Sequence, residues 1–178
     1  MIKDSDQQYG LISKLFHWLS ALCIVGLFAA GWWMVELDYY SEWYRTAPHW
    51  HKSIGILLLI ATIARIGWKL LTPSPKALAE HSAATVKISK LGHSVMYLLM
   101  VIIMLSGYLI STADGRGIEV FTWFEVPSLG ELFENQEDIA GTIHEYLAYG
   151  LIGLAVLHAL AALKHHFVDK DKTLSRMM

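Results

Sequence analysis

Four histidines, each set in a long apolar segment, constrain this chain more than any other feature of its sequence. They are His17, His51, His144 and His158. A titratable side chain within a membrane span is costly and is usually retained for a function. His144 and His158 are 14 residues apart, so they share one face of a helix and lie about 21 Å apart along its axis. This spacing predicts two cofactor positions stacked along one helix.

The composition indicates an integral membrane protein. The chain is 54% hydrophobic and only 17% charged, whereas soluble domains carry about 25% charged residues. Four apolar stretches have roughly the 20 residues that a membrane span needs. They cover residues 15–37, 50–71, 91–111 and 143–167. We therefore predict an all-α, four-helix transmembrane bundle in which residues 1–178 form a single domain.

The basic residues predict the orientation of the bundle. Four spans place both termini on one side of the membrane, and the segments on that side hold 11 of the 14 lysines and arginines. The opposite side holds 11 of the 16 carboxylates. Because positive charge accumulates on the cytoplasmic side, we expect both termini and the loop over residues 72–90 to be cytoplasmic.

The predicted depths arrange the four histidines in pairs. His17 and His158 fall near the inner face, while His51 and His144 fall near the outer face. Two neutral imidazoles that bind one iron from opposite sides fill both axial positions, and such an iron is suited to electron transfer. A closed zinc site is the alternative, but it needs its ligands at one level, and these histidines occupy two levels.

The cysteine content restricts the type of haem. The chain has one cysteine, Cys23, and no Cys-x-x-Cys-His motif, which excludes a disulfide within the chain and c-type attachment. We therefore predict two non-covalent b-type haems.

Basic side chains and a further histidine lie close to these positions. Arg65 shares a helix face with His51 and could bind an inner haem propionate or extend to the lipid headgroups. Lys52 is a candidate for the outer propionates. His49 competes with His51, but the two differ by about 200° around a helix, so only one can face the bundle, and we favour His51.

Three more histidines are candidates for a quinone site. His93, His165 and His166 are expected near the cytoplasmic interface, where they could exchange protons with a quinone or simply be hydrated. His81 lies in the cytoplasmic loop and is expected to be solvated.

Several short motifs carry a family resemblance. They are Phe16-His17-Trp18, His51-Lys52-Ser53-Ile54-Gly55-Ile56, Leu91-Gly92-His93, His144-Glu145, His158 and the tail His165-His166-Phe167…Lys170-Asp171…Arg176-Met177. With these motifs the sequence resembles the bacterial cytochrome b561 family over essentially its whole length. The tail is the most specific part, since no generic membrane helix requires it.

The resemblance implies a set of ligands and a location. It implies that His17 and His158 ligate one haem and that His51, rather than His49, joins His144 on the other. It also implies the bacterial inner membrane and electron exchange with quinone near the cytoplasmic haem. The same four-helix plan resembles the di-haem subunits of membrane dehydrogenases and hydrogenases.

Three functions follow as hypotheses. We favour electron transfer between a periplasmic redox partner and the quinone pool. A superoxide:ubiquinone oxidoreductase ranks lower, because the long outer loop is acidic and an anion is steered by positive potential. The third is a membrane-anchor subunit of a larger dehydrogenase. The expected partners are membrane lipid, ubiquinone and a periplasmic donor or acceptor; nucleic acid is not expected, and a homodimer is left open.

Overall fold

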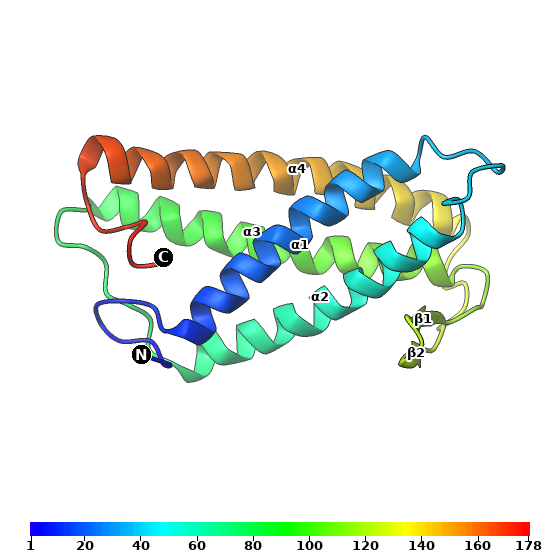
Figure 1. The fold of residues 1–178 in the computed structure, drawn as a ribbon, viewed down its shortest axis with the longest axis horizontal. Helices are drawn as coiled ribbons and strands as arrows, with labels where there is room; N and C mark the ends of the chain where they lie inside the picture. The colour runs from blue at the N-terminus through cyan, green and yellow to red at the C-terminus, as the bar shows by residue number, and fades with distance from the viewer.

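Four long helices form the molecule in the computed structural model, which describes residues 1–178 (Figure 1). The helices are α1 (Leu11–Met34), α2 (Thr46–Leu71), α3 (Ala83–Thr112) and α4 (Gln136–Lys164). Each is long and apolar enough to cross a membrane. The predicted all-α membrane fold is therefore confirmed.

All four helices begin before the predicted spans, but α1 ends at Met34 rather than at residue 37. Helix α3 begins at Ala83 rather than at residue 91, because the Ser82 side chain accepts a hydrogen bond from the Thr85 backbone N–H and caps its first turn. Helix α4 begins at Gln136 rather than at residue 143. At its other end it continues as a short π-helix over His165–Asp169. Hydropathy predicts the apolar part of a helix and misses these polar turns.

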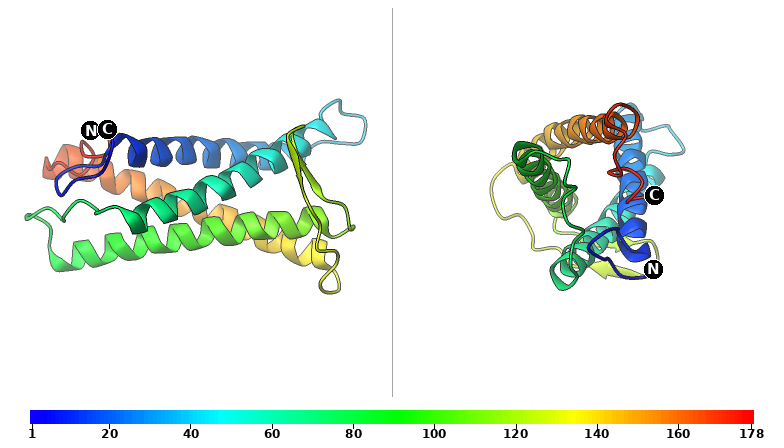
Figure 2. Two further views of the ribbon diagram at one scale, coloured as in Figure 1. Left: turned by 90° about the horizontal axis from the view of Figure 1, so that it is seen from below. Right: turned by 90° about the vertical axis from the view of Figure 1, so that its left-hand side faces the viewer.

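The two ends of the bundle differ. Both termini lie at one end, and the connection between α3 and α4 carries a small β-hairpin at the other (Figures 1 and 2). We call these the terminal end and the hairpin end. Within the bundle, α3 packs along α4 and α1 along α2, while α2 also contacts α3. The end-on view in Figure 2 shows the four helices arranged around a common axis.

The hairpin was not predicted from the sequence. Strands β1 (Ile118–Val120) and β2 (Phe124–Val126) pair antiparallel. The fully buried hydroxyl of Ser53 on α2 donates to the Glu119 carbonyl at 3.3 Å and accepts from the Phe121 N–H at 2.9 Å. This contact fixes the hairpin against the first turns of α2.

The interior is sparsely packed for a chain of this length. Only 16 of 178 residues are buried, so the apolar surface mostly faces outward, where lipid can cover it. The main buried cluster lies in the middle of the bundle and consists of Leu58, Met100, Met104 and Leu151. Leu151 is seven residues from both His144 and His158, so this apolar layer separates the two histidine levels.

The C-terminal tail is anchored to the rest of the terminal end. Arg176 donates to the backbone carbonyls of Gln7 at 2.5 Å, Lys76 at 2.9 Å and Asp6 at 3.4 Å. Trp18 donates its indole N–H to the Met177 carbonyl at 2.9 Å. The motif that made the tail distinctive in sequence therefore binds the N-terminal segment and the α2–α3 loop together.

Candidate functional site

The structure brings the four histidines together in two pairs. The ring centres of His51 and His144 lie 6.2 Å apart near the hairpin end, and those of His17 and His158 lie 6.2 Å apart near the terminal end. We call these the hairpin-end pair and the terminal-end pair. Each pair joins residues on two different helices.

The separation within each pair suits one iron held between two imidazoles. A metal–imidazole bond is about 2 Å long and each ring centre lies about 1 Å beyond its nitrogen, so opposed ligands have ring centres roughly 6 Å apart. An iron bound by two histidines in this way would have no open position for a diatomic ligand, and would therefore favour electron transfer over oxygen chemistry. The residues present therefore fit a b-type haem at each level.

Local contacts prepare His144 for this role. Its Nδ1 lies 2.8 Å from the Ile103 carbonyl and 3.2 Å from the Ser106 hydroxyl on α3. A carbonyl can only accept, so Nδ1 carries the proton and Nε2 keeps a free lone pair. This is the arrangement in which protein groups commonly orient a metal-binding histidine.

Two glycines make room for the hairpin-end pair. A Cβ on Gly107 would lie 3.1 Å from Cε1 of His144, and a Cβ on Gly31 would lie 3.4 Å from Cε1 of His51. The Nδ1 of His51 is buried without a hydrogen-bond partner, an uncommon state for a ring nitrogen. No pattern in the sequence predicts these two contacts, because they depend on how neighbouring helices pack.

A half-open groove of about 450 Å³ adjoins His51 between α1 and α2, within the size range of small-molecule and cofactor sites. Its walls are mostly apolar and include Leu22, Cys23, Gly26, Leu27, Ala30, Trp33, Trp50 and Ile54. Such a surface suits the apolar faces of a porphyrin.

His49 does not face the bundle. Its ring centre lies 6.2 Å from that of Phe121 in the hairpin, which also contacts Trp50 at 5.5 Å. His51, two residues later, faces His144. The geometry therefore separates the two histidines that the sequence left in competition.

The two basic candidates lie in different settings. An Nη2 atom of Arg65 lies 3.4 Å from Nδ1 of His17, and its guanidinium lies 5.3 Å from the Tyr97 ring centre. Arg65 therefore lies inside the bundle beside the terminal-end pair. Lys52 is half-buried at the hairpin end, where its positive charge attracts the carboxylate of Asp114. Hydrogen bonds from Arg116, with a smaller effect of Lys52, hold the pKa of Asp114 below its usual value.

The three quinone candidates are separated by the structure. His93 lies beside the terminal-end pair, with its ring centre 5.3 Å from that of His158. His165 packs instead against His81, at a ring-centre distance of 4.7 Å, and His166 is exposed beside Phe167.

The prediction that His81 is solvated was wrong. Its side chain is only 17% exposed, and its Nε2 lies 2.9 Å from Asp171. The sequence signal was weak, because these two residues are 90 positions apart.

Comparisons with known proteins agree with this geometry. A family model described as prokaryotic cytochrome b561 matches residues 8–178. The chain is 49% identical to cytochrome b561 homolog 2 of Escherichia coli K12, over 98% of this chain and 93% of that protein. It is 31% identical to the probable superoxide oxidase CybB of Yersinia pestis, over 97% and 96% of the two chains. Cytochrome b561 homolog 1 of Escherichia coli K12 is 27% identical over 91% and 92%.

The match to the family model extends over nearly all of the chain, and so do the matches to the relatives. Together with the four apolar helices, they identify a multi-pass membrane protein of electron transport with b-type haem. The chain belongs to the prokaryotic cytochrome b561 family.

Proposed function

We propose that this protein transfers single electrons across the membrane between a redox partner at the hairpin end and quinone at the terminal end. Two b haems, held by the hairpin-end and terminal-end pairs, would supply the one-electron iron chemistry. The observation that carries this proposal is the equal ring separation of 6.2 Å in the two pairs. Each pair provides two imidazoles and therefore two axial ligands.

The charge distribution supports a direction in the membrane. Eleven of the 14 lysines and arginines belong to the terminal end, which by the positive-inside rule is the cytoplasmic face of a bacterial inner membrane. The hairpin end would then face the periplasm. Its excess of carboxylates suits a basic protein or a cationic carrier as the outer partner.

The residues around the terminal-end pair suit a reaction in which electron transfer is coupled to proton transfer. Reduction of a quinone to a quinol takes two electrons and two protons. His93 lies beside His158 and can hold or pass a proton, while Arg65 can bind an anionic group such as a haem propionate. Of the three histidines considered for quinone, His93 is the one next to a proposed haem ligand.

Reaction of the purified haem-loaded protein with a short-chain ubiquinol tests this proposal. We expect ubiquinol to reduce the haem. His93→Ala should slow this reaction on the order of 100-fold, the lower range for a positioned acid–base group. Reduction by dithionite should be unchanged, since dithionite has no proton to pass to His93 when it gives up electrons. His166→Ala is the matched control, because that side chain is exposed and away from the pair. A protein whose haem does not react with ubiquinol contradicts the proposal.

Superoxide oxidation is the second candidate, favoured by the 31% identity to a probable superoxide oxidase. In that reaction two superoxide ions are oxidised to dioxygen, and one quinone takes up the two electrons and two protons. The hairpin end opposes it, because it carries 11 carboxylates against three basic side chains, and one of the three, Arg116, is paired with Asp114. Quinone-dependent consumption of enzymatically generated superoxide would select this candidate. Copurification of a large catalytic subunit would instead select a membrane anchor.

A further inference from the structure

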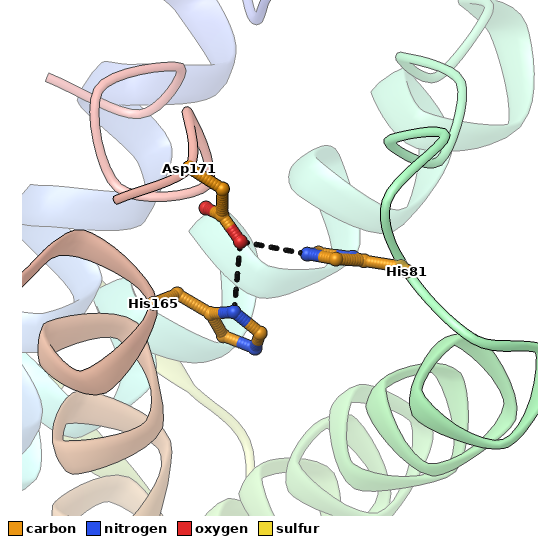
Figure 3. A group of neighbouring side chains, drawn as sticks. All are labelled: His81, His165 and Asp171. Carbon is orange, nitrogen blue, oxygen red and sulfur yellow. Dashed lines mark hydrogen bonds and ion pairs between the residues drawn. The ribbon is translucent and has the colours of Figure 1, made fainter. Parts of the chain in front are cut away.

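A group of three metal-binding side chains lies at the terminal end, outside both histidine pairs. His81 comes from the α2–α3 loop, His165 from the start of the π-helix and Asp171 from the C-terminal tail (Figure 3). Their potential ligand atoms all lie within 4.8 Å of one another. None of the three has a role in the proposed electron transfer.

One carboxylate oxygen stands between the two imidazoles. The Oδ2 atom of Asp171 is 2.9 Å from Nε2 of His81 and 2.8 Å from Nδ1 of His165. All three side chains are largely buried: His81 is 17% exposed, His165 is 18% exposed and Asp171 is 8% exposed. Two imidazole nitrogens and one carboxylate oxygen make a donor set that Zn²⁺ commonly takes.

The carboxylate is held ready in its ionised form. The Thr173 backbone N–H donates to Oδ1 of Asp171 at 2.7 Å, which leaves Oδ2 facing the histidines. Burial by itself raises the pKa of Asp171, but hydrogen bonds from Thr173 and His81 outweigh it and hold the pKa below its usual value. Asp169 is bound by Lys164 at 2.8 and 3.0 Å, and its Oδ2 atom also lies 2.9 Å from Nδ1 of His165. Only Asp171 lies within reach of both His81 and His165.

Hydrogen bonding does not account for the whole cluster. His81 makes a hydrogen bond to Asp171. In contrast, Nδ1 of His165 is buried and makes no hydrogen bond, although Oδ2 of Asp171 is 2.8 Å away and Oδ2 of Asp169 is 2.9 Å away. Both oxygens therefore lie off the direction in which that nitrogen can donate. Ligands of one metal are oriented in this way, because each lone pair points at the metal rather than at the other ligand. Tetrahedral ligands with bonds of about 2 Å lie about 3.3 Å apart, so the side chains would separate by about 0.5 Å when the metal binds.

The backbone around His165 is unusual in a way that builds this geometry. The π-helix over His165–Asp169 ends at Lys170, whose φ of 55° lies in the left-handed region. The chain then reverses, and the Asp171 N–H donates to the His165 carbonyl at 3.1 Å. π-Helical turns and left-handed residues other than glycine occur often at functional sites. Here they fold the tail back onto the helix.

We propose that His81, His165 and Asp171 form a binding site for a divalent transition metal of the zinc class. The bound metal would tie the α2–α3 loop to the C-terminal tail, and water would fill the remaining coordination position. The site is independent of the proposed haem ligation and quinone reaction. It also assigns His165 to metal binding rather than to quinone.

Zinc binding to the haem-loaded protein, prepared without a histidine tag, tests this proposal. The protein is equilibrated with Zn²⁺ against a chelator of known affinity, and zinc per chain is measured by mass spectrometry, which separates zinc from haem iron. We expect one zinc per wild-type chain. His81→Gln and Asp171→Asn should each weaken binding on the order of 100-fold, since even supporting residues of a metal site contribute 10- to 100-fold.

His166→Ala is the matched control, because it removes the adjacent but exposed imidazole and should keep full zinc binding. Helix content by circular dichroism shows whether each variant is folded, and the two ligand variants test the same site independently. Wild-type protein that takes up no zinc overturns the proposal. Equal binding by all four proteins, or loss of binding in His166→Ala, overturns the assignment of these ligands.

Discussion

The two histidine pairs share one geometry but lie in different surroundings. Both have ring centres 6.2 Å apart. Around the hairpin-end pair lie an apolar groove, two closely placed glycines and the carbonyl of Ile103, which orients His144. Around the terminal-end pair lie the cation Arg65 and a third histidine, His93.

With the proposed ligation, this difference suits the two histidine pairs to different parts of the electron-transfer reaction. An apolar, close-fitting site suits an electron-transfer group that exchanges no protons. A site with a cation and a further titratable side chain suits the level at which electrons meet protons. A positive charge near a redox centre favours its reduced state, so we also expect the terminal-end haem to have the higher reduction potential.

Removal of a single proposed ligand should have the largest effect, because it should remove one haem and leave the other. His144→Ala should abolish the hairpin-end haem and keep the terminal-end haem, because the two levels are about 21 Å apart along α4. His158→Ala should do the reverse. Haem per chain, measured as the pyridine haemochrome, should fall by about half in each variant, since one of the two axial ligand pairs is lost.

His49→Ala is the control for the ligand variants, because His49 faces Phe121 instead of the bundle. It should keep both haems. If His49→Ala lost the hairpin-end haem and His51→Ala kept it, the assignment in α2 would be reversed.

Gly107→Ala should disturb only the hairpin-end level. Its Cβ would lie 3.1 Å from Cε1 of His144, so the imidazole must shift. Overpacking of this kind costs about 1–3 kcal/mol, which corresponds to roughly tenfold weaker retention of the hairpin-end haem. Transfer of haem to an excess of apomyoglobin measures the retention. Gly153→Ala, where a Cβ meets nothing within 4 Å, should behave as wild type.

Arg65→Leu tests whether the charge of Arg65 makes the reduction potentials of the two haems differ. Loss of the cation beside His17 should lower the reduction potential of the terminal-end haem on the order of 60 mV, a tenfold change for one electron. The hairpin-end potential should stay within error. A redox titration followed in the visible spectrum measures both values, and equal shifts of both haems would show that Arg65 does not act locally.

Ser106→Ala should have the smallest effect. The Ser106 hydroxyl lies 3.2 Å from Nδ1 of His144, but the Ile103 carbonyl at 2.8 Å remains as its acceptor. The free energy of unfolding should fall by about 1 kcal/mol, the net value of one hydrogen bond. Thermal unfolding measures this change, and loss of the hairpin-end haem would show that Ser106 has a larger role.

The fold could be predicted from the sequence where hydropathy determines it. Four apolar segments predicted four spanning helices, and the structure confirms them. The polar first turns of α3 and α4 and the β-hairpin were missed. The position of the hairpin depends on the hydroxyl of Ser53, which binds backbone groups 66 and 68 residues away, and on the burial of Ile118 and Val120 against Ile56. No local pattern in the sequence reports such a contact.

The candidate site could likewise be predicted where spacing within one helix determines it, but not where contacts between elements do. The 14-residue spacing of His144 and His158 is a helical property, so it predicted two levels. The approach of Gly107 to His144 depends on how α3 packs along α4, and the pairing of His81 with Asp171 depends on the π-helical turn. These are tertiary contacts, which residue spacing alone does not determine.

Haem stoichiometry tests the central claim most directly. The detergent-purified wild-type protein should contain two haems per chain and show a reduced-minus-oxidised visible spectrum of low-spin b-type haem. One haem per chain, or a high-spin spectrum with an open axial position, would contradict bis-histidine ligation by both pairs.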